Sequence, residues 1–243
     1  MSKKSDNLFS APLEQIVDFK FDEKVANVFE DMINRSIPGY GSIISIVGML
    51  AEKYAKPKSN LYDLGTSLGA SALSMRRSVK DSSCKIIAVD NSQAMINRAS
   101  GFFESDNSTI PVKLICEDIA DTKITNASVV VLNYTLQFVQ KEKRDELIKK
   151  ICNGLLPGGI LILSEKIKFK NKETNERQIE LYHSFKKLNG YSDLEISQKR
   201  NALEKVLIPE TIEDHKKRIL NAGFSTCDVW FQSFNFISII AQK

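Results

Sequence analysis

Two short apolar runs, each ending in an acidic residue, constrain this chain more than any other feature. Residues 60–70 read NLYDLGTSLGA and residues 86–90 read IIAVD. The first run predicts a buried strand to Asp63, a turn of small residues, and a helix from Ala70 to about Lys80. The second predicts a buried strand ending at Asp90. This order is typical of a nucleotide-binding βαβ unit, in which the turn and the helix N-terminus face the ligand and the second acid reaches ribose hydroxyls.

The alternation of strands and helices continues beyond this unit. Apolar runs predict strands at 112–116, 128–133 and 160–164, and helical spacing predicts helices near 92–100 and 141–155. Near-continuous apolar strands alternating with helices indicate a parallel sheet that is covered on both faces. After a helix that ends near Leu220, residues 228–231 and 236–240 predict two antiparallel strands. We therefore predict an α/β, Rossmann-like fold, with a mostly parallel sheet and a C-terminal antiparallel hairpin.

The length of the chain suits one large domain. We expect a single domain over residues 1–243 of the 243-residue chain, because domains of this size are common. Within it, residues 1–58 predict an N-terminal arm and a helical cap, which leads directly into the ligand site. Residues 59–168 and 208–243 predict the Rossmann-like core. Residues 169–207 predict a polar helical insertion, and residues 156–159, which read LPGG, predict a sharp exit from the preceding helix.

The glycine turn distinguishes between two kinds of nucleotide ligand. The dinucleotide fingerprint requires glycine at 65, 67 and 70, where the chain has Gly65, Ser67 and Ala70. The pattern of S-adenosylmethionine binders, acid-x-Gly-x-Gly-x-Gly, matches Asp63, Gly65 and Gly69, with Ser67 at its middle position. The second pattern fits better, since that ligand has no pyrophosphate. A strand-to-helix turn that binds no ligand remains the alternative.

Further polar residues close consecutive predicted strands. Asp90 has two carboxylate oxygens that can accept hydrogen bonds from vicinal ribose hydroxyls, although it also suits an Asx turn before the next helix. Asp118 and the Ile119 amide can read an adenine amino edge, or they can be ordinary loop residues. Asn133 follows a fully apolar strand and is a site candidate or a strand-end cap. All three side chains are expected at the carboxyl edge of the sheet, where open α/β sheets bind ligands.

Two residues outside the sheet are also candidates. Arg200 is predicted on the apolar face of a helix, together with Ile196, Leu203, Val206 and Leu207. A guanidinium in that position requires an anion, an interface or an escape to water, and snorkelling or a structural ion pair remains open. Tyr40 could lay its ring and hydroxyl over the ligand, or it could pack on the helical cap.

Composition and residue spacing bear on four features of the protein: nucleic-acid binding, a metal site, disulfide bonds and membrane spans. A net charge of +4 permits a nucleic-acid partner without arguing for one. Neither histidine is paired with cysteine or carboxylate at ligand spacing, so we predict no metal site. The cysteines are far apart and are expected to be reduced core thiols of a cytoplasmic protein; they are Cys84, Cys116, Cys152 and Cys227. No apolar run is long enough to span a bilayer.

Several segments, spread over nearly the whole chain, together carry a family resemblance. They are LFSAP at 8–12, FDE at 21–23, RSIPGY at 35–40, YDLG at 62–65, DNS at 90–92, LNYTLQF at 132–138, LSEK at 163–166, NGYS at 189–192, EISQKR at 195–200 and WFQ at 230–232. With these segments the chain resembles the carboxy-S-adenosylmethionine synthases of bacterial transfer-RNA wobble-uridine modification. The glycine loop alone would suggest only a class I S-adenosylmethionine-dependent methyltransferase fold, whereas the other segments are specific to the synthases.

The resemblance implies a reaction and a set of ligand contacts. S-adenosylmethionine and prephenate would give carboxy-S-adenosylmethionine, phenylpyruvate and water. Arg200 would bind the new carboxylate, and no side-chain base is assigned. Matched by position, the ligand contacts would be Tyr40, Gly65, Thr66, Ser67, Asp90, Asn91, Asp118, Ile119, Asn133 and Arg200. One departure is Thr66, where the family usually has cysteine; we expect this position to contact the ligand through its backbone.

The resemblance also implies partners. Family members are usually homodimers, so we expect a homodimer, with no direct requirement for nucleic acid or membrane. Contact with the tRNA carboxymethyltransferase of the pathway is a further possibility. Two alternatives remain open: an S-adenosylmethionine-dependent methyltransferase acting on a small molecule or tRNA, and a non-catalytic nucleoside-binding partner of a tRNA-modification enzyme.

Overall fold

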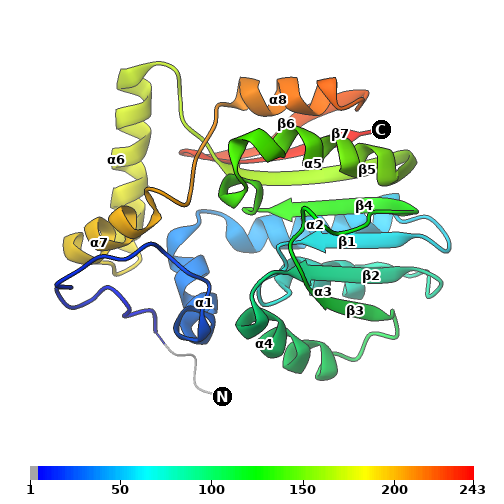
Figure 1. The fold of residues 1–243 in the computed structure, drawn as a ribbon, viewed down its shortest axis with the longest axis horizontal. Coiled ribbons are helices and arrows are strands. Elements are labelled where there is room, and N and C mark those ends of the chain that lie inside the picture. Colours follow the sequence, from blue (N-terminus) through cyan, green and yellow to red (C-terminus); the bar gives the residue numbers. More distant parts are fainter. Residues whose placement is uncertain (1–4) are drawn as a thin grey trace.

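A seven-stranded sheet forms the centre of the molecule in a computed structural model, which describes residues 5–243 (Figure 1). The strand order is β3-β2-β1-β4-β5-β7-β6. β1 to β5 run parallel, and β7 runs antiparallel to both of its neighbours. The strands are β1 (Asn60–Leu64), β2 (Lys85–Asp90), β3 (Val112–Cys116), β4 (Ala127–Asn133), β5 (Leu155–Lys166), β6 (Thr226–Ser233) and β7 (Phe236–Gln242). This arrangement confirms the predicted Rossmann-like fold and its antiparallel C-terminal hairpin.

Most helices begin at side chains that cap them. Asp22 and Ser92 each accept a hydrogen bond from a backbone amide of the helix that follows, and Ser192 and Thr211 form capping boxes. The helices are α1 (Glu23–Ser36), α2 (Tyr40–Tyr54), α3 (Ala70–Ser78), α4 (Gln93–Glu104), α5 (Lys141–Gly154), α6 (Lys172–Leu188), α7 (Asp193–Leu203) and α8 (Ile212–Asn221), with a short 3-10 helix, η1 (Leu136–Phe138).

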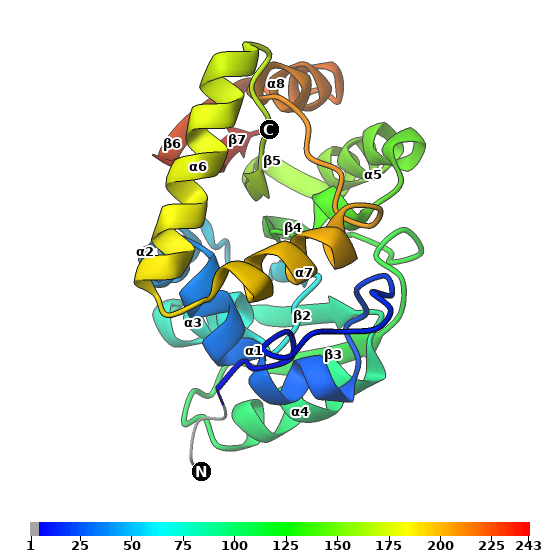
Figure 2. The same ribbon diagram turned by 90° about the vertical axis from the view of Figure 1, so that its left-hand side faces the viewer.

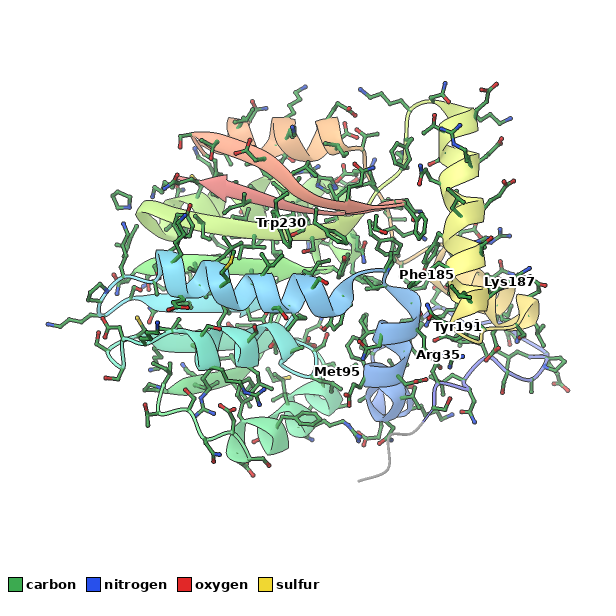
Figure 3. All side chains as sticks on the ribbon, turned by 180° about the vertical axis from the view of Figure 1, so that it is seen from behind. Arg35, Met95, Phe185, Lys187, Tyr191 and Trp230 are labelled. Carbon is green, nitrogen blue, oxygen red and sulfur yellow. The ribbon has the colours of Figure 1, made fainter. Side chains whose placement is uncertain are left out.

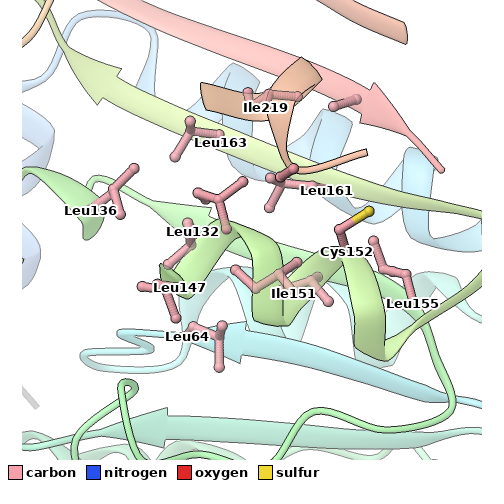
Figure 4. Close-up of a cluster of buried hydrophobic side chains, with 14 of the residues drawn as sticks. Leu64, Leu132, Leu136, Leu147, Ile151, Cys152, Leu155, Leu161, Leu163 and Ile219 are labelled. Atoms are coloured by element: carbon pink, nitrogen blue, oxygen red, sulfur yellow. The ribbon is translucent and has the colours of Figure 1, made fainter. Parts of the chain in front are cut away.

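The sheet is covered on both faces, as the apolar strands predict. One core packs α5 and α8 against β1, β4 and β5, and Figure 4 shows Ile151 and Ile219 of these helices beside Leu161 of β5. The other core packs α2, α3 and α4 on the opposite face, which Figure 3 shows from behind. Alternate residues of one strand enter different cores, with Val130 in the first and Val131 in the second, because successive side chains of a strand point to opposite faces.

The carboxyl ends of the parallel strands meet at one edge of the sheet, and α1, α6 and α7 stand beyond that edge (Figure 2). The N-terminal arm fastens α7 in place. Gln198 of α7 donates to the carbonyls of Phe9 and Ala11 and accepts from the amide of Leu13. Arg35 of α1 stacks on the ring of Tyr191, 4.0 Å from its centroid, where α1 meets the α6–α7 turn (Figure 3).

Two local predictions are wrong, and a third gains detail. The helix exit at 156–159 lies inside β5, which begins at Leu155 and bulges against β4; Gly158 has φ 71° there. The predicted helical insertion consists of two helices, because Gly190, with φ 85°, follows the end of α6 and turns the chain into α7. Cys116 is exposed and Cys227 is half-buried, because both lie on edge strands; only Cys84 and Cys152 are core thiols.

Candidate active site

A cavity of about 1200 Å³ lies at the carboxyl edge of the parallel strands. Its walls come from the strand ends, the N-terminal arm, the cap helices α1 and α2, and the insertion helices α6 and α7. Nine of the ten predicted ligand contacts line it: Tyr40, Gly65, Thr66, Ser67, Asp90, Asn91, Asp118, Ile119 and Asn133. The topology therefore brings together residues that lie up to 93 positions apart in the sequence.

The glycine loop adopts backbone conformations that favour glycine. Gly65 has φ 81°, and a Cβ at this position would collide with Thr135. Ser67 has φ 49°, a conformation uncommon for a residue with a side chain. Its amide points across to the next strand and donates to Asp90 Oδ2 at 2.8 Å. The loop is thus held close to the end of β2, with little room for larger residues.

Asp63 supports the loop from below rather than lining the cavity. Its Oδ2 accepts hydrogen bonds from the Thr66 hydroxyl at 2.7 Å and from the Ala72 amide at 3.0 Å. Burial raises the pKa of this carboxyl to about 6, against the opposing effect of these donors. The side chain of Thr66, at the position where the family usually has cysteine, therefore has a structural role as a hydrogen-bond donor.

Asp90 forms the turn that its position in the sequence suggests, and its carboxylate also faces the cavity. Its Oδ1 accepts from the Ser92 amide at 2.9 Å, which forms the expected turn before α4. The carboxylate also lines the cavity and is 8% exposed. Burial raises its pKa, while the Ser92 and Ser67 amides act in the opposite direction. Each oxygen has a second lone pair for a ligand hydroxyl.

Asp118 and Ile119 follow β3 and line the cavity at the carboxyl edge of the sheet. Asp118 is exposed, and its Oδ1 accepts from the Ala120 amide at 2.8 Å, so the loop role is confirmed. Both residues nevertheless line the cavity beside Asp90 and Asn91. A carboxylate and a neighbouring backbone amide offer the acceptor and donor that an adenine edge requires.

Asn133 presents an unsatisfied acceptor to the cavity. Its side-chain nitrogen donates to the Ser71 hydroxyl at 3.3 Å, while its buried Oδ1 has no hydrogen-bond partner within residues 5–243. Buried polar atoms are rarely left unpaired, and each such atom suggests a missing partner. The ammonium group of an amino-acid moiety such as that of S-adenosylmethionine would supply one. The next residue, Tyr134, has φ 61°, and its hydroxyl is also buried without a partner in this part of the chain.

Tyr40 lines the cavity from the cap. It is the first residue of α2 and follows Gly39, which has φ 71° and lies against the ring of Phe231. Burial, together with Asp63 and Glu30, keeps the pKa of its phenol above the usual range. The hydroxyl therefore stays protonated and can donate a hydrogen bond into the cavity.

Arg200 does not lie where the helical pattern predicts. It is exposed and is absent from the cavity wall, and α7 ends at Leu203, so Val206 and Leu207 do not continue its face. The buried face of α7 consists of Glu195, Ile196, Gln198, Lys199 and Ala202. Arg200 is nevertheless close enough to Lys166 and His183 to lower the pKa of both. It lies beside the cavity, on the outer side of α7.

Other residues that line the cavity were not predicted, because they come from segments without a ligand-binding motif. Lys166 ends β5, Lys186 and Tyr182 lie on α6, Lys199 lies on α7, and Phe236 begins β7. Only Lys166 carried a sequence signal, since it follows an apolar strand at the same edge as Asp90 and Asn133. These residues make one end of the cavity cationic and aromatic.

Known proteins are similar to this chain over its full length. The carboxy-S-adenosyl-L-methionine synthase of Geobacter sp. (strain M21) is 58% identical over 244 residues and covers 100% of both chains. The synthase of Vibrio parahaemolyticus is 58% identical over 238 residues, 98% of this chain and 97% of that one. The chain belongs to the carboxy-S-adenosyl-L-methionine synthase family. The methyltransferase-domain family model matches residues 61–159 alone, which is the first part of the core.

Solved structures support the fold of this synthase-family chain. A putative O-methyltransferase from Nostoc punctiforme superimposes with a TM-score of 0.65 at 15% identity, covering 91% of this chain and 59% of that one. A putative S-adenosyl-L-methionine-dependent methyltransferase from Methanococcus maripaludis gives a TM-score of 0.59 at 19% identity, with coverage of 96% and 97%. Both establish the class I methyltransferase fold.

Residues 5–243 lack two kinds of feature. No group of three or more His, Cys, Asp or Glu side chains is arranged to hold a metal ion there. None of the described helices has the length and apolar character needed to cross a membrane.

Proposed function

We propose that the chain is a carboxy-S-adenosyl-L-methionine synthase, which converts S-adenosylmethionine and prephenate to carboxy-S-adenosylmethionine, phenylpyruvate and water. One observation carries the proposal. The 58% identity extends over the whole chain, beyond the methyltransferase region at 61–159. The arm, cap and insertion included in that identity also supply the cavity walls opposite the strand ends.

The strand-end residues suit the nucleoside and the amino-acid moiety. We infer that Asp90 accepts from the ribose hydroxyls and that Asp118 and the Ile119 amide read the adenine edge. Asn133 Oδ1, which is buried without a protein partner in the described chain, accepts from the ligand ammonium. With these inferred contacts, the sulfonium would lie between the glycine loop and the cationic end of the cavity.

The reaction balances without a metal or a side-chain base. Prephenate loses its ring carboxylate as carbon dioxide, and the electron pair of that bond completes the aromatic ring while hydroxide leaves. The hydroxide takes a proton from the sulfonium methyl, whose carbon is acidified by the positive sulfur. The resulting ylide attacks carbon dioxide and forms the carboxymethyl sulfonium. The protein supplies positioning and excludes water.

Arg200 is proposed to bind the new carboxylate. A plain methyltransferase gains nothing from a cation near a sulfonium, because like charges repel. Arg200 is exposed, and the insertion also exposes Leu188 (87%) and Leu194 (39%). These features support a homodimer through α6 and α7, in which Arg200 is ordered at the interface.

The product suggests a place in tRNA modification. We infer that carboxy-S-adenosylmethionine passes to a tRNA carboxymethyltransferase that modifies wobble uridine, in the cytoplasm and with no direct contact of this chain with nucleic acid. Co-purification tests whether this chain contacts that enzyme directly.

Mass spectrometry of the nucleoside carried by the purified protein tests the proposed activity. The expected ligand is heavier than S-adenosylmethionine by one carbon dioxide. S-adenosylhomocysteine together with a methylated acceptor would indicate a methyltransferase. S-adenosylmethionine alone, with no turnover when prephenate is added, would indicate a non-catalytic nucleoside-binding protein.

A further inference from the structure

Two lysines face the cavity without an anionic partner. Lys166 is the last residue of β5 and Lys186 lies in the last turn of α6. Both line the cavity, and Lys186 is only 5% exposed. Within residues 5–243, no carboxylate forms an ion pair with either lysine, and neither ammonium donates a hydrogen bond. Both stand beside the ring of Tyr182, at 5.0 and 5.5 Å from its centroid.

The neighbouring Lys199, in contrast, has partners within the protein. Its ammonium pairs with Asp6 at 3.4 Å and donates to the Ser36 hydroxyl at 3.1 Å. Buried charges in proteins are normally paired in this way, because an unpaired ammonium loses its hydration. Buried Lys186 and half-buried Lys166 have no such pair within residues 5–243, although they lie in the same cavity. This difference points to a partner outside the chain.

The pKa values of the two lysines also support an anionic partner from outside the chain. Burial, helped by Arg200, lowers the pKa of Lys166 to about 8. Burial, with Lys199 and Lys166, lowers the pKa of Lys186 to about 7, although Asp6 and Glu195 act in the opposite direction. The protein environment therefore disfavours the charged form of both lysines. A bound anion would raise both pKa values and favour the charged forms.

We propose that Lys166 and Lys186 form the binding site for the carboxylate that the carboxyl donor retains in its product. This inference rests on the proposed function, which gives the donor two carboxylates, one lost and one kept. The location agrees with it. Asn133, assigned to the sulfonium's amino-acid moiety, pairs with Ser164 in the β4–β5 register, and Lys166 follows two residues later. The donor and the sulfonium thus lie at adjacent strand ends.

The chemistry decides which carboxylate meets the lysines. The leaving carboxylate becomes neutral carbon dioxide, so an ammonium bound to it would stabilise the ground state and oppose the bond cleavage. The retained carboxylate keeps its charge throughout, and it can be held without raising the barrier. The reacting ring then lies along the aromatic wall formed by Tyr134, Tyr182 and Phe236, with its leaving carboxylate toward the methyl.

Calorimetric titration of prephenate into protein saturated with S-adenosylhomocysteine tests this site, because no reaction follows binding. Lys166→Met and Lys186→Met are each expected to weaken prephenate binding about 10- to 100-fold. Their affinity for S-adenosylhomocysteine should not change. The matched control is Lys187→Met on the same helix, whose side chain is 51% exposed and pairs with Asp193 (Figure 3); it should bind prephenate as the wild type does.

The melting temperature of the empty protein gives a second readout. Removal of an unpaired buried cation should leave it unchanged or raise it, whereas Lys199→Met, which breaks the pair with Asp6, should lower it. Wild-type prephenate affinity in both Met variants, or a marked loss of stability in both, would overturn the lysine site while leaving the proposed function intact. A wild-type protein that neither binds prephenate nor carboxylates S-adenosylmethionine would overturn both.

Discussion

The Ser67 amide donates to Asp90 Oδ2 at 2.8 Å and so ties the loop after β1 to the end of β2. Asp90 is further fixed by the Ser92 amide at 2.9 Å on its other oxygen. Two amides thus orient one carboxylate toward the cavity before any ligand arrives. A preoriented acceptor costs little conformational entropy when it binds, so this pair is the expected anchor for the ribose.

Replacement of Asp90 should therefore weaken nucleoside binding. Asp90→Asn keeps one acceptor oxygen but loses the charge and the second acceptor, and we expect the Kd for S-adenosylhomocysteine to rise about 10- to 100-fold. Calorimetric titration measures it. Asp81→Asn makes the same change in a turn that does not line the cavity, where the carboxylate accepts from Ser83. Equal affinities in the two variants would refute the ribose assignment.

The Thr66 hydroxyl should stabilise the fold through Asp63. Thr66→Val removes a donor from a buried carboxylate whose other oxygen already lacks a partner in the described chain. We expect the free energy of unfolding to fall by about 1–3 kcal/mol in urea denaturation. Thr66→Ser keeps the hydroxyl and should stay close to the wild type, with Thr66→Cys between them, because a thiol is a weak donor. A valine variant as stable as the serine variant would show that the bond contributes nothing.

Glu165 should make stability depend on pH. Its Oε1 accepts from the Leu136 amide at 3.0 Å, and burial raises its pKa to about 8 despite the opposing charge of Arg144. Above pH 4.5 the unfolded chain has released a proton that the folded chain retains. This group therefore lowers the free energy of unfolding as pH rises from about 4.5 to 8, by about 1.4 kcal/mol per pH unit.

Glu165→Gln abolishes this titration while keeping an acceptor for Leu136. The variant should gain stability relative to the wild type steadily from pH 5 to pH 8, as measured by urea denaturation at each pH. Glu213→Gln, at a carboxylate that is 65% exposed, is the control and should show a flat difference. A flat difference for Glu165→Gln would mean that Glu165 is ionised throughout the range.

Arg200 should determine preference between ligands rather than stability. Arg200→Ala is expected to abolish the preference for carboxy-S-adenosylmethionine over S-adenosylmethionine, and to leave the melting temperature close to that of the wild type because the side chain is exposed. The ratio of the two dissociation constants measures the effect. Arg177→Ala removes another exposed cation from the insertion and should keep the ratio. An unchanged ratio in the Arg200 variant would show that its role is misassigned.

The strand-end part of the site could be predicted because its signals are local. An apolar run that ends at Asp90 or Asn133 predicts a strand, and it also predicts that its polar last residue lies at the carboxyl edge of the sheet. Parallel pairing then brings these residues together without further information. The glycine loop could be predicted for a similar reason. Gly65 occupies a position where a positive φ and the proximity of Thr135 require glycine, so the residue type itself marks the turn.

The position of Arg200 could not be predicted, because tertiary contacts end α7 where the sequence would let it continue. Residues 204–207 contain no glycine or proline. The Ile208 amide donates to the Gln137 carbonyl at 3.0 Å, and the Ile208 carbonyl accepts from the buried Arg144 at 3.0 Å. These contacts draw the chain away from the helix axis, so the apolar periodicity beyond Leu203 belongs to a different segment.

The lysine site was also beyond prediction. Lys166 and Lys186 lie 20 positions apart, and only the return of α6 over the end of β5 places both beside Tyr182. Neither sequence neighbourhood shows the absence of a carboxylate partner. That absence is a property of the folded cavity, and it is what distinguishes these lysines from Lys199.

The most direct test of the central claim follows a labelled carbon. The protein is incubated with S-adenosylmethionine and with prephenate that carries carbon-13 in its ring carboxylate, and the nucleoside product is analysed by mass spectrometry. We predict a carboxymethyl sulfonium that is heavier than S-adenosylmethionine by one labelled carbon dioxide and is formed only with prephenate. An unlabelled product, or S-adenosylhomocysteine as the only nucleoside product, would contradict the account.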